Sequence, residues 1–235
     1  MVSWIFSPNI KTVHGFSTRH GGVSEGAFAS LNFGAGDDKP ELIVQNKMIA
    51  LGALKINHEA VCSVKQVHGN RVIIAERGMQ EADALVSNEQ GVPIAIGVAD
   101  CYPILYHDPV NKVIGAAHAG WRGTVTGIAG NTVEEMVKLG AVPENIQVAI
   151  GQGICTDKFE VGQEVIDQFK KNGFFDSCIK GNHIDLIAAN KQVLEKSGIN
   201  PENIWCMNRC TFESDFFSYR RDKGKTGRMW AIITL

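Results

Sequence analysis

Residues 92–123 read VPIAIGVADCYPILYHDPVNKVIGAAHAGWRG. This stretch predicts three strands, over residues 92–99, 104–106 and 112–118, because short apolar runs are separated by polar residues, proline and glycine. The runs lack strict alternation of apolar and polar residues, which is typical of strands buried on both faces. The centre of the chain is therefore expected to form an interior sheet.

The flanking sequence adds strands and helices in interleaved order. Further short strands are predicted at residues 2–6, 12–17, 60–65, 71–75, 83–86, 147–150, 204–207 and 229–234. Helices are predicted at residues 40–51, 128–139, 163–171 and 185–196. For the first helix, Asp38 is well placed as the N-cap, Pro40 in the first turn and Gly52 as the C-cap. Because clustered strands dominate the middle of the chain, the pattern favours an α+β fold over a doubly wound α/β fold.

Composition indicates a globular protein and excludes several other classes. Hydrophobic residues make up 44% of the 235 residues and charged residues 20%, which excludes intrinsic disorder. A net charge of −2 provides no global basic field for nucleic acid or an anionic membrane surface. No stretch of proline, serine or charge divides the chain, so residues 1–235 are expected to form a single domain, with the oligomeric state left open.

The sequence also bears on location and redox state. The N-terminus has no basic region followed by a long apolar run, so it does not look like a signal peptide. The longest apolar stretch, residues 91–106, is interrupted by Asp100 and two prolines and is not expected to span a bilayer. Six cysteines are present, but without a secretion signal a disulfide framework is not expected. We therefore predict a cytoplasmic protein with reduced thiols.

Three side chains with metal-binding chemistry lie where apolar runs meet glycine or a turn: His68, Cys101 and His118. Their wide spacing differs from the close ligand pairs of structural zinc sites and matches a catalytic site built from separate strand ends. One thiolate and two imidazoles suit Zn²⁺ or copper, and not Mg²⁺ or Ca²⁺. The alternative is an ordinary buried thiol and two hydrogen-bonded histidines. Asp100 favours the site, because a carboxylate inside an apolar run needs a partner or a function.

Three segments offer cationic groups to an anionic ligand, and they contain Arg19, Arg122 and Arg220. The segment of Arg122 precedes the helix predicted from residue 128, whose N-terminus would favour phosphate. Arg220 opens a basic tail that continues through Arg221 to Arg228, for which a solvated positive face is the alternative. The pair Cys206 and Cys210 is a weaker candidate for a further metal site, since no second pair completes it.

Taken together, eight segments resemble the laccase-domain family in content and order. They are TRHGGVS (18–24), LNFG (31–34), KQVHG (65–69), ADAL (82–85), DCYP (100–103), HAGWRG (118–123), FEVG (159–162) and FSYRR (217–221). The resemblance covers nearly the whole chain. It departs from the family at Gly151–Ile154, where the family usually has Gly-Pro. Members of this family were once called multicopper polyphenol oxidases and were later described as purine nucleoside phosphorylases with adenosine deaminase activity.

The resemblance carries expectations about fold and metal. It implies layered, packed β-sheets flanked by helices, similar to the cysteine hydrolase fold of cytotoxic necrotising factor. The family's ligand motifs match His68, Cys101 and His118, which implies a zinc site, with copper as the alternative.

The same resemblance implies phosphorolysis of adenosine, inosine, guanosine or methylthioadenosine, together with adenosine deamination. The substrates would be purine nucleosides and phosphate. Deamination needs an activated water and a carboxylate that moves protons, for which Asp100 and Asp83 are the candidates. Phosphorolysis needs an anion site, assigned here to Arg19, Arg122 and Arg220, while Asn32 is a candidate to bind ribose or base.

Other functions remain open at this point. Copper-dependent phenol oxidation is one, although the His-x-His motifs of cupredoxin-type laccases do not occur in the sequence. A metal-free cysteine hydrolase would use Cys101 as nucleophile and His118 as base, and it would have no need of His68. A non-catalytic binding module is the third alternative.

Overall fold

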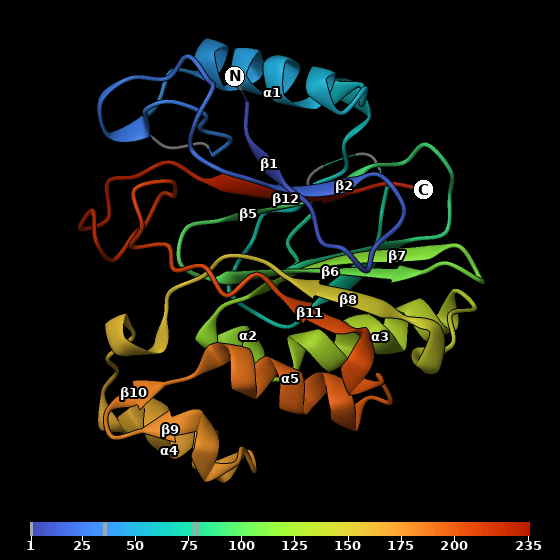
Figure 1. The fold of residues 1–235 in the computed structure, drawn as a ribbon, viewed down its shortest axis with the longest axis vertical. Helices are drawn as coiled ribbons and strands as arrows, with labels where there is room; N and C mark the ends of the chain where they lie inside the picture. Colours follow the sequence, from blue (N-terminus) through green and yellow to red (C-terminus); the bar gives the residue numbers. More distant parts are fainter. Residues whose placement is uncertain (1, 35–36, 77, 79) are drawn as a thin grey trace.

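The computed structural model describes residues 2–34, 37–76, 78 and 80–235. Its elements stack in four layers: one helix, a four-stranded sheet, a six-stranded sheet and a group of helices (Figure 1). The four-stranded sheet has the order β1 (Trp4–Ile5), β2 (His14–Ser17), β12 (Met229–Ile233), β5 (Ile94–Val98). All neighbouring strands in this sheet are antiparallel.

The six-stranded sheet contains the strands of the central sequence. Its order is β11 (Ile204–Cys206), β8 (Gln147–Ile150), β6 (Tyr102–Asp108), β7 (Val113–Ala119), β4 (Ala84–Ser87), β3 (Val72–Ile74). The outer pairs β11–β8 and β3–β4 are parallel, and the three inner pairs are antiparallel. The β6–β7 hairpin therefore lies in the middle of the sheet.

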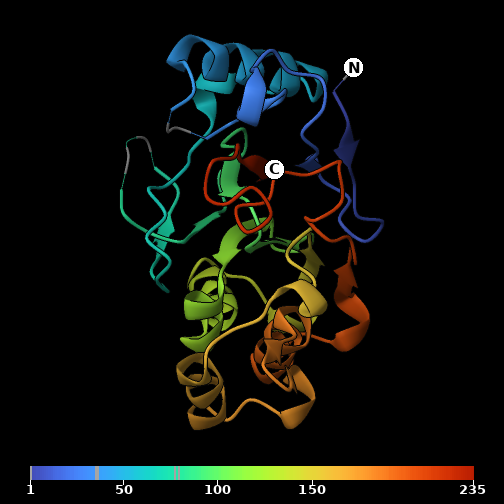
Figure 2. The same cartoon turned by 90° about the vertical axis from the view of Figure 1, so that its left-hand side faces the viewer.

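Helices cover the outer faces of both sheets. Helix α1 (Pro40–Ala53) lies over the four-stranded sheet, and α2 (Trp121–Val125), α3 (Ile128–Lys138) and α5 (Leu186–Lys196) lie over the six-stranded sheet (Figure 1). Helix α4 (Gln163–Lys171) and the hairpin β9 (Ile179–Lys180)–β10 (His183–Ile184) lie at the far end of the molecule (Figure 2). Within the described ranges, no helix is both long and apolar enough to cross a membrane.

The uninterrupted apolar runs follow from this layering. In β12, Met229, Ala231 and Ile233 pack between the two sheets, whereas Trp230 and Ile232 pack toward α1. Successive side chains of a strand point to opposite faces, so a strand covered on both sides needs apolar residues at every position. The prediction of strands buried on both faces is therefore confirmed.

The α+β class is confirmed, and most predicted elements lie within a few residues of those observed. Residues 60–65 are an exception, because they form only isolated bridges, from Cys62 to Ile94 and from Lys65 to Glu81, and no strand. The sequence analysis also missed α2, β9 and β10, which are too short to show a period. The likeness to the fold of cytotoxic necrotising factor stays a prediction.

The predicted caps of α1 are wrong. Lys39 is the N-cap and makes no side-chain capping bond, and the helix continues past Gly52 to a C-cap at Leu54. The Asp38 carboxylate is used elsewhere, since Oδ2 accepts hydrogen bonds from Ser24 Oγ at 2.7 Å and Asn32 Nδ2 at 2.8 Å. A buried polar network thus ties the start of α1 to the loop of residues 18–34.

Arg221 is an anchor of the loop before β12, contrary to the solvated face considered for it. Its guanidinium donates to the carbonyls of Thr211, Glu213 and Phe216 at 2.9–3.0 Å and pairs with Asp222. A lysine has no planar fork and cannot reach all of these acceptors together.

We expect Arg221→Lys to lower the free energy of unfolding by about 2 kcal/mol, because buried carbonyls lose charge-assisted hydrogen bonds. Urea unfolding of the purified variant measures this loss. Arg71→Lys is the matched control, since the exposed Arg71 guanidinium donates to a single carbonyl of the described residues, that of Glu81. Equal losses in the two variants would contradict the anchoring role of Arg221.

Candidate active site

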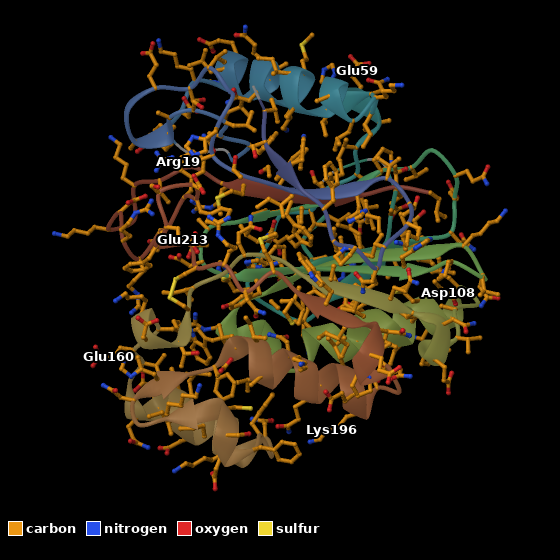
Figure 3. The ribbon with its side chains drawn as sticks, viewed as in Figure 1. Arg19, Glu59, Asp108, Glu160, Lys196 and Glu213 are labelled. Atoms are coloured by element: carbon orange, nitrogen blue, oxygen red, sulfur yellow. A yellow bond between two sulfur atoms is a disulfide. The ribbon has the colours of Figure 1, made fainter. Side chains whose placement is uncertain are left out.

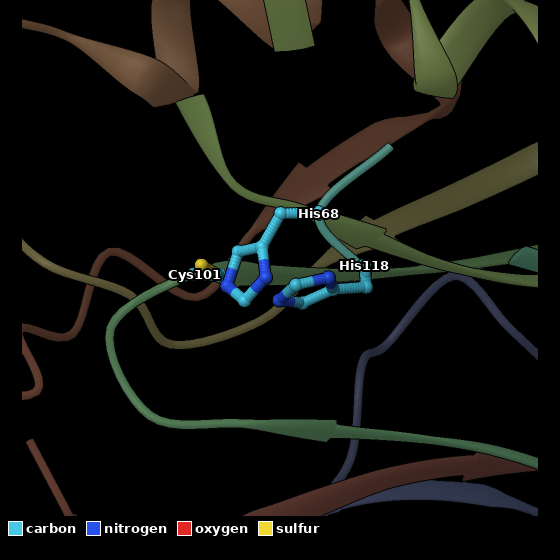
Figure 4. A group of neighbouring side chains, drawn as sticks. All are labelled: His68, Cys101 and His118. Atoms are coloured by element: carbon cyan, nitrogen blue, oxygen red, sulfur yellow. The ribbon is translucent and has the colours of Figure 1, made fainter. Parts of the chain in front are cut away.

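The three predicted ligands come together at one end of the six-stranded sheet. The ligand atoms of His68, Cys101 and His118 all lie within 4.8 Å of one another. The two imidazole rings are 4.9 Å apart between centroids and meet at 77°, with Cys101 beside the His68 ring (Figure 4). We call these three residues the ligand trio.

Strand register explains why residues so distant in sequence meet here. In the β6–β7 hairpin Pro103 pairs with His118, which brings Cys101, just before β6, next to the end of β7. Gly120 directly follows β7. A Cβ at this position would lie 2.9 Å from Cys101 Sγ. The glycine is therefore needed for the close approach of the two segments.

Asp83, directly before β4, holds the two histidines in place. Its Oδ1 accepts from His118 Nδ1 at 2.8 Å and from the His68 backbone N–H at 2.9 Å, and its Oδ2 accepts from the Gly69 N–H at 2.7 Å. The bond to His118 Nδ1 leaves Nε2 for a metal, as carboxylates behind metal-binding histidines commonly do. Burial alone would raise the pKa of Asp83, but the bonds from His118 and the backbone lower it. This geometry suits a positioning role for Asp83.

The trio is charged in a way that favours metal binding. Burial would raise the pKa of the Cys101 thiol, but His118 and His68 lower it to about 6. Burial would lower the pKa of His118, but Cys101 and Asp83 raise it to about 9. Without metal, the pair is therefore a thiolate beside an imidazolium at neutral pH. A thiolate with two imidazoles is a donor set that fits Zn²⁺ with one open position. The same ion pair would also serve a cysteine nucleophile.

A cavity of about 990 Å³ opens beside the trio. Its volume is at the upper end of those that bind small molecules. Among the described residues, five cationic side chains line it, against the two carboxylates of Asp38 and Asp100; the cations are Lys47, Lys65, Arg122, Arg220 and Arg228. Aromatic side chains form much of the remaining wall; they include Phe33, Trp121, Phe159, Tyr219 and Trp230. The cavity thus suits a ligand that has both an anionic part and a flat, weakly polar part.

Arg122 and Arg220 line this cavity, as a role in substrate binding requires. Arg122 lies in the short helix α2, which precedes α3, and its guanidinium lies 4.5 Å from the Trp121 ring; the phosphate site at a helix N-terminus stays a prediction. Arg220 donates from Nη1 to the Glu160 carbonyl at 3.2 Å and lies 5.6 Å from the Phe159 ring.

Arg19 and Asn32 are not among the residues that line the cavity. Arg19, in the loop after β2 (Figure 3), donates from Nε to the Ala29 carbonyl at 2.7 Å and lies over the Phe217 ring. Asn32 is fully buried, and it donates to Asp38 and accepts from the Arg228 N–H at 2.8 Å. Asn32 thus supports Arg228, which lines the cavity.

Asp100 lines the cavity with a backbone φ of +88°, in the left-handed region that favours glycine. Its Oδ1 accepts from Thr211 Oγ1 at 2.5 Å and its Oδ2 from the Arg220 N–H at 2.7 Å. The carboxylate therefore joins the segment of Cys101 to the loop that carries Arg220.

The structure corrects the prediction of reduced thiols. Cys155 and Cys210 form a disulfide across 55 residues of sequence, next to the bridge between Gly153 and Cys210. The metal pair considered for Cys206 and Cys210 is wrong for the same reason. Because disulfides are uncommon in the cytoplasm, the cytoplasmic location stays a prediction.

The sequence analysis missed several residues of the cavity. Arg228 was expected only within a basic tail, and Lys47 and Trp230 were not singled out. Trp230 stacks on Phe33 at 5.0 Å, and the Lys47 ammonium lies 4.9 Å from the Trp230 ring. In the sequence, Lys47 lies in an apolar helix and Trp230 in an apolar strand. Such patterns are equally typical of core elements, so they do not indicate a cavity.

Comparisons with known proteins agree with the motifs. Residues 13–235 match the family described as multi-copper polyphenol oxidoreductase laccase. A purine nucleoside phosphorylase of Deinococcus radiodurans is 46% identical over 97% of this chain and 91% of its own length. The adenosine deaminase RL5 of an unknown prokaryotic organism is 35% identical over 97% of this chain and 96% of its own length.

Solved structures give the same result. YlmD of Geobacillus stearothermophilus superposes with a TM-score of 0.91 at 34% identity, over 97% of this chain and 93% of its own. The hypothetical protein YfiH of Bacillus licheniformis superposes with a TM-score of 0.90 at 31% identity, over 94% of this chain and 92% of its own. Since the match extends over nearly the whole chain in sequence and in structure, this protein belongs to the multi-copper polyphenol oxidoreductase laccase family, the laccase-domain family that its motifs predict.

Proposed function

We propose that this protein is a zinc-dependent purine nucleoside phosphorylase that also deaminates adenosine. The observation that carries the proposal is a thiolate and two imidazoles within 4.8 Å of one another, in the wall of a cationic and aromatic cavity. Relatives named purine nucleoside phosphorylase and adenosine deaminase support both reactions. Adenosine, inosine, guanosine and methylthioadenosine are the proposed nucleosides.

In this proposal His68, Cys101 and His118 hold the zinc ion. Bound zinc supplies a Lewis acid and an activated water near neutral pH, which is the chemistry that deamination at C6 of adenosine needs. Asp83 acts through the two histidines, which it orients with hydrogen bonds of 2.8 and 2.9 Å. Asp100 lines the cavity, so of the two candidates Asp83 and Asp100 it is the proposed proton carrier.

Phosphorolysis transfers ribose from the purine to phosphate through a transition state with positive charge at C1′. Arg122 and Arg220 line the cavity and are the proposed phosphate ligands, whereas Arg19 is not among the lining residues. Aromatic walls such as Phe159 and Tyr219 offer flat apolar surface to the purine. Asn32 positions the neighbouring Arg228 rather than contacting ribose or base.

Two alternatives use the same trio. Copper would also accept these donors, but among the described residues the trio is the only group of three or more candidate ligands, whereas reduction of O₂ by a laccase uses a multinuclear cluster. A metal-free Cys101–His118 dyad has the required ion pair, but a dyad has no need of a second imidazole such as His68. Both observations favour zinc.

The direct test is a product assay on zinc-loaded and chelated protein. We expect ribose 1-phosphate from inosine only with both zinc and phosphate, and zinc-dependent inosine from adenosine; mass spectrometry identifies the products. If zinc-loaded protein forms neither product, the purine function is wrong.

We expect His68→Ala to lose bound zinc and to reduce both reactions at least about 100-fold, because two ligands hold the ion poorly. Metal analysis and the product assay measure the two effects. His58→Ala is the control, since His58 lies on a turn outside the trio and the cavity lining. Activity that survives zinc loss would favour the cysteine dyad.

We expect Asp83→Asn to weaken zinc affinity about 10- to 100-fold, because the amide no longer orients His118 and His68 as an anion does. Competition with a chromogenic chelator measures the affinity. Asp108→Asn is a matched control, since the buried Asp108 also accepts backbone N–H groups, from Val110 and Val142, away from the trio. If both variants bind zinc as the unmodified protein does, Asp83 has no positioning role.

A further inference from the structure

The cations of the cavity differ in how many donors they leave free. Lys65 pairs with Glu81 at 2.8 Å, and Arg122 and Arg220 are exposed to solvent. Arg228 is partly buried and has no carboxylate partner in the described part of the chain. A guanidinium in this position loses hydration without gaining an anion, which is unfavourable unless a ligand supplies one.

The backbone around Arg228 fixes where its side chain lies. Its N–H donates to Asn32 Oδ1 at 2.8 Å, and its carbonyl accepts from the Phe33 N–H at 3.0 Å. Its Nη1 donates to the carbonyls of Thr226 and Gly227, both at 3.0 Å. Within the described part of the chain no partner is found for the Nε and Nη2 donors, which form the edge of a guanidinium that binds two oxygens of one anion.

The Arg228 side chain packs directly against Gly34. A Cβ at residue 34 would lie 2.4 Å from Arg228 Cγ and 2.9 Å from its Cβ. Real carbon atoms do not approach so closely, so a larger residue would displace Arg228 from its place. The glycine of the motif at residues 31–34 therefore has a steric role in the cavity.

Arg228 shares this cavity with the ligand trio and Asp100. Burial lowers the pKa of Arg228, and the charge of Cys101 is the largest influence that opposes this. The charge of Asp100 acts in the same direction, but among the described residues no hydrogen bond joins it to Arg228; its oxygens accept from Thr211 and the Arg220 N–H. The guanidinium is thus close to the trio and still available to a ligand.

We propose that Arg228 binds the phosphate used in phosphorolysis through its Nε–Nη2 edge, and that Gly34 holds it in the productive position. This inference rests on the proposed function and adds to it the residue that selects the phosphate. Deamination consumes no phosphate, so loss of Arg228 impairs phosphorolysis more than deamination.

The first measurement is binding of inorganic phosphate by titration calorimetry, which requires no turnover. We expect Arg228→Gln to weaken phosphate binding at least about 30-fold, since a charge and a bidentate contact are lost. Arg228→Lys keeps the charge without the fork and should weaken it less. Gly34→Ala should weaken it as well, although it leaves the arginine in the sequence. Arg71→Gln, an exposed arginine outside the cavity, should bind phosphate like the unmodified protein.

The second measurement compares the two reactions in the same variants. We expect Arg228→Gln to raise the KM for phosphate and to lower the ratio of phosphorolysis to deamination at least about 10-fold. Zinc content and thermal unfolding identify any variant that has lost its fold. If Arg228→Gln does not fold, the phosphate affinities of Arg228→Lys and Gly34→Ala test the inference instead.

Three results would overturn the inference: no phosphate binding by the unmodified protein, unchanged binding in folded Arg228→Gln, or equal loss of both reactions. Phosphate binding that depends on Arg228 in a protein without phosphorolysis would support the anion site and contradict the proposed function.

Discussion

The buried carboxylate of Asp83 is the constraint on which the site depends. It accepts hydrogen bonds from His118 Nδ1 and from the backbone of His68 and Gly69, so one side chain positions two metal ligands from separate segments. His68 has a left-handed backbone, with φ at +61°, and such a conformation persists when surrounding bonds fix it. Asp83 directly precedes β4, which pairs with β7. The pairing extends to Asp83, because its carbonyl accepts a hydrogen bond from the His118 N–H.

The layered fold makes this arrangement rigid. Strands β6, β7 and β4 are buried along their whole length, so a shift of register would turn apolar side chains toward the wrong layer. The ligands lie where these strands end, and there the chain leaves the core and exposes polar groups. A site at strand ends thus combines fixed backbone positions with access to a cavity.

This explains how much the sequence could predict. The strands of the centre and the helices at residues 128–138 and 163–171 were predictable because burial imposes a local pattern. In α3, for example, Ile128, Thr132 and Met136 are buried at four-residue intervals, and Gly140 ends the pattern with φ at +100°. The ligand trio was predictable because its side chains lie where apolar runs end and because the motifs that contain them resemble those of the laccase-domain family.

The wall of the cavity could not be predicted in the same way. Asn32 and Arg228 are hydrogen-bonded across 196 residues, and nothing in either local sequence indicates the other. Arg19 and Arg228 are both arginines in glycine-containing loops, yet Arg19 packs on Phe217 outside the cavity lining and Arg228 lines the cavity. The Cys155–Cys210 disulfide depends likewise on a bridge between distant loops. Long-range loop packing decides these roles, and it has no local period.

The net charge of the chain likewise does not predict the electrostatics of the cavity, because these depend on which charges lie side by side in the fold. A total of −2 gives the sum of the charges, but it does not describe how charges are paired inside. The carboxylates nearest the trio, Asp83 and Asp100, are turned to backbone N–H groups, an imidazole and a hydroxyl rather than to arginines. Arg228 therefore keeps its charge for a ligand although acids lie close to it. Local hydrogen bonding, more than composition, makes this cavity attractive to an anion.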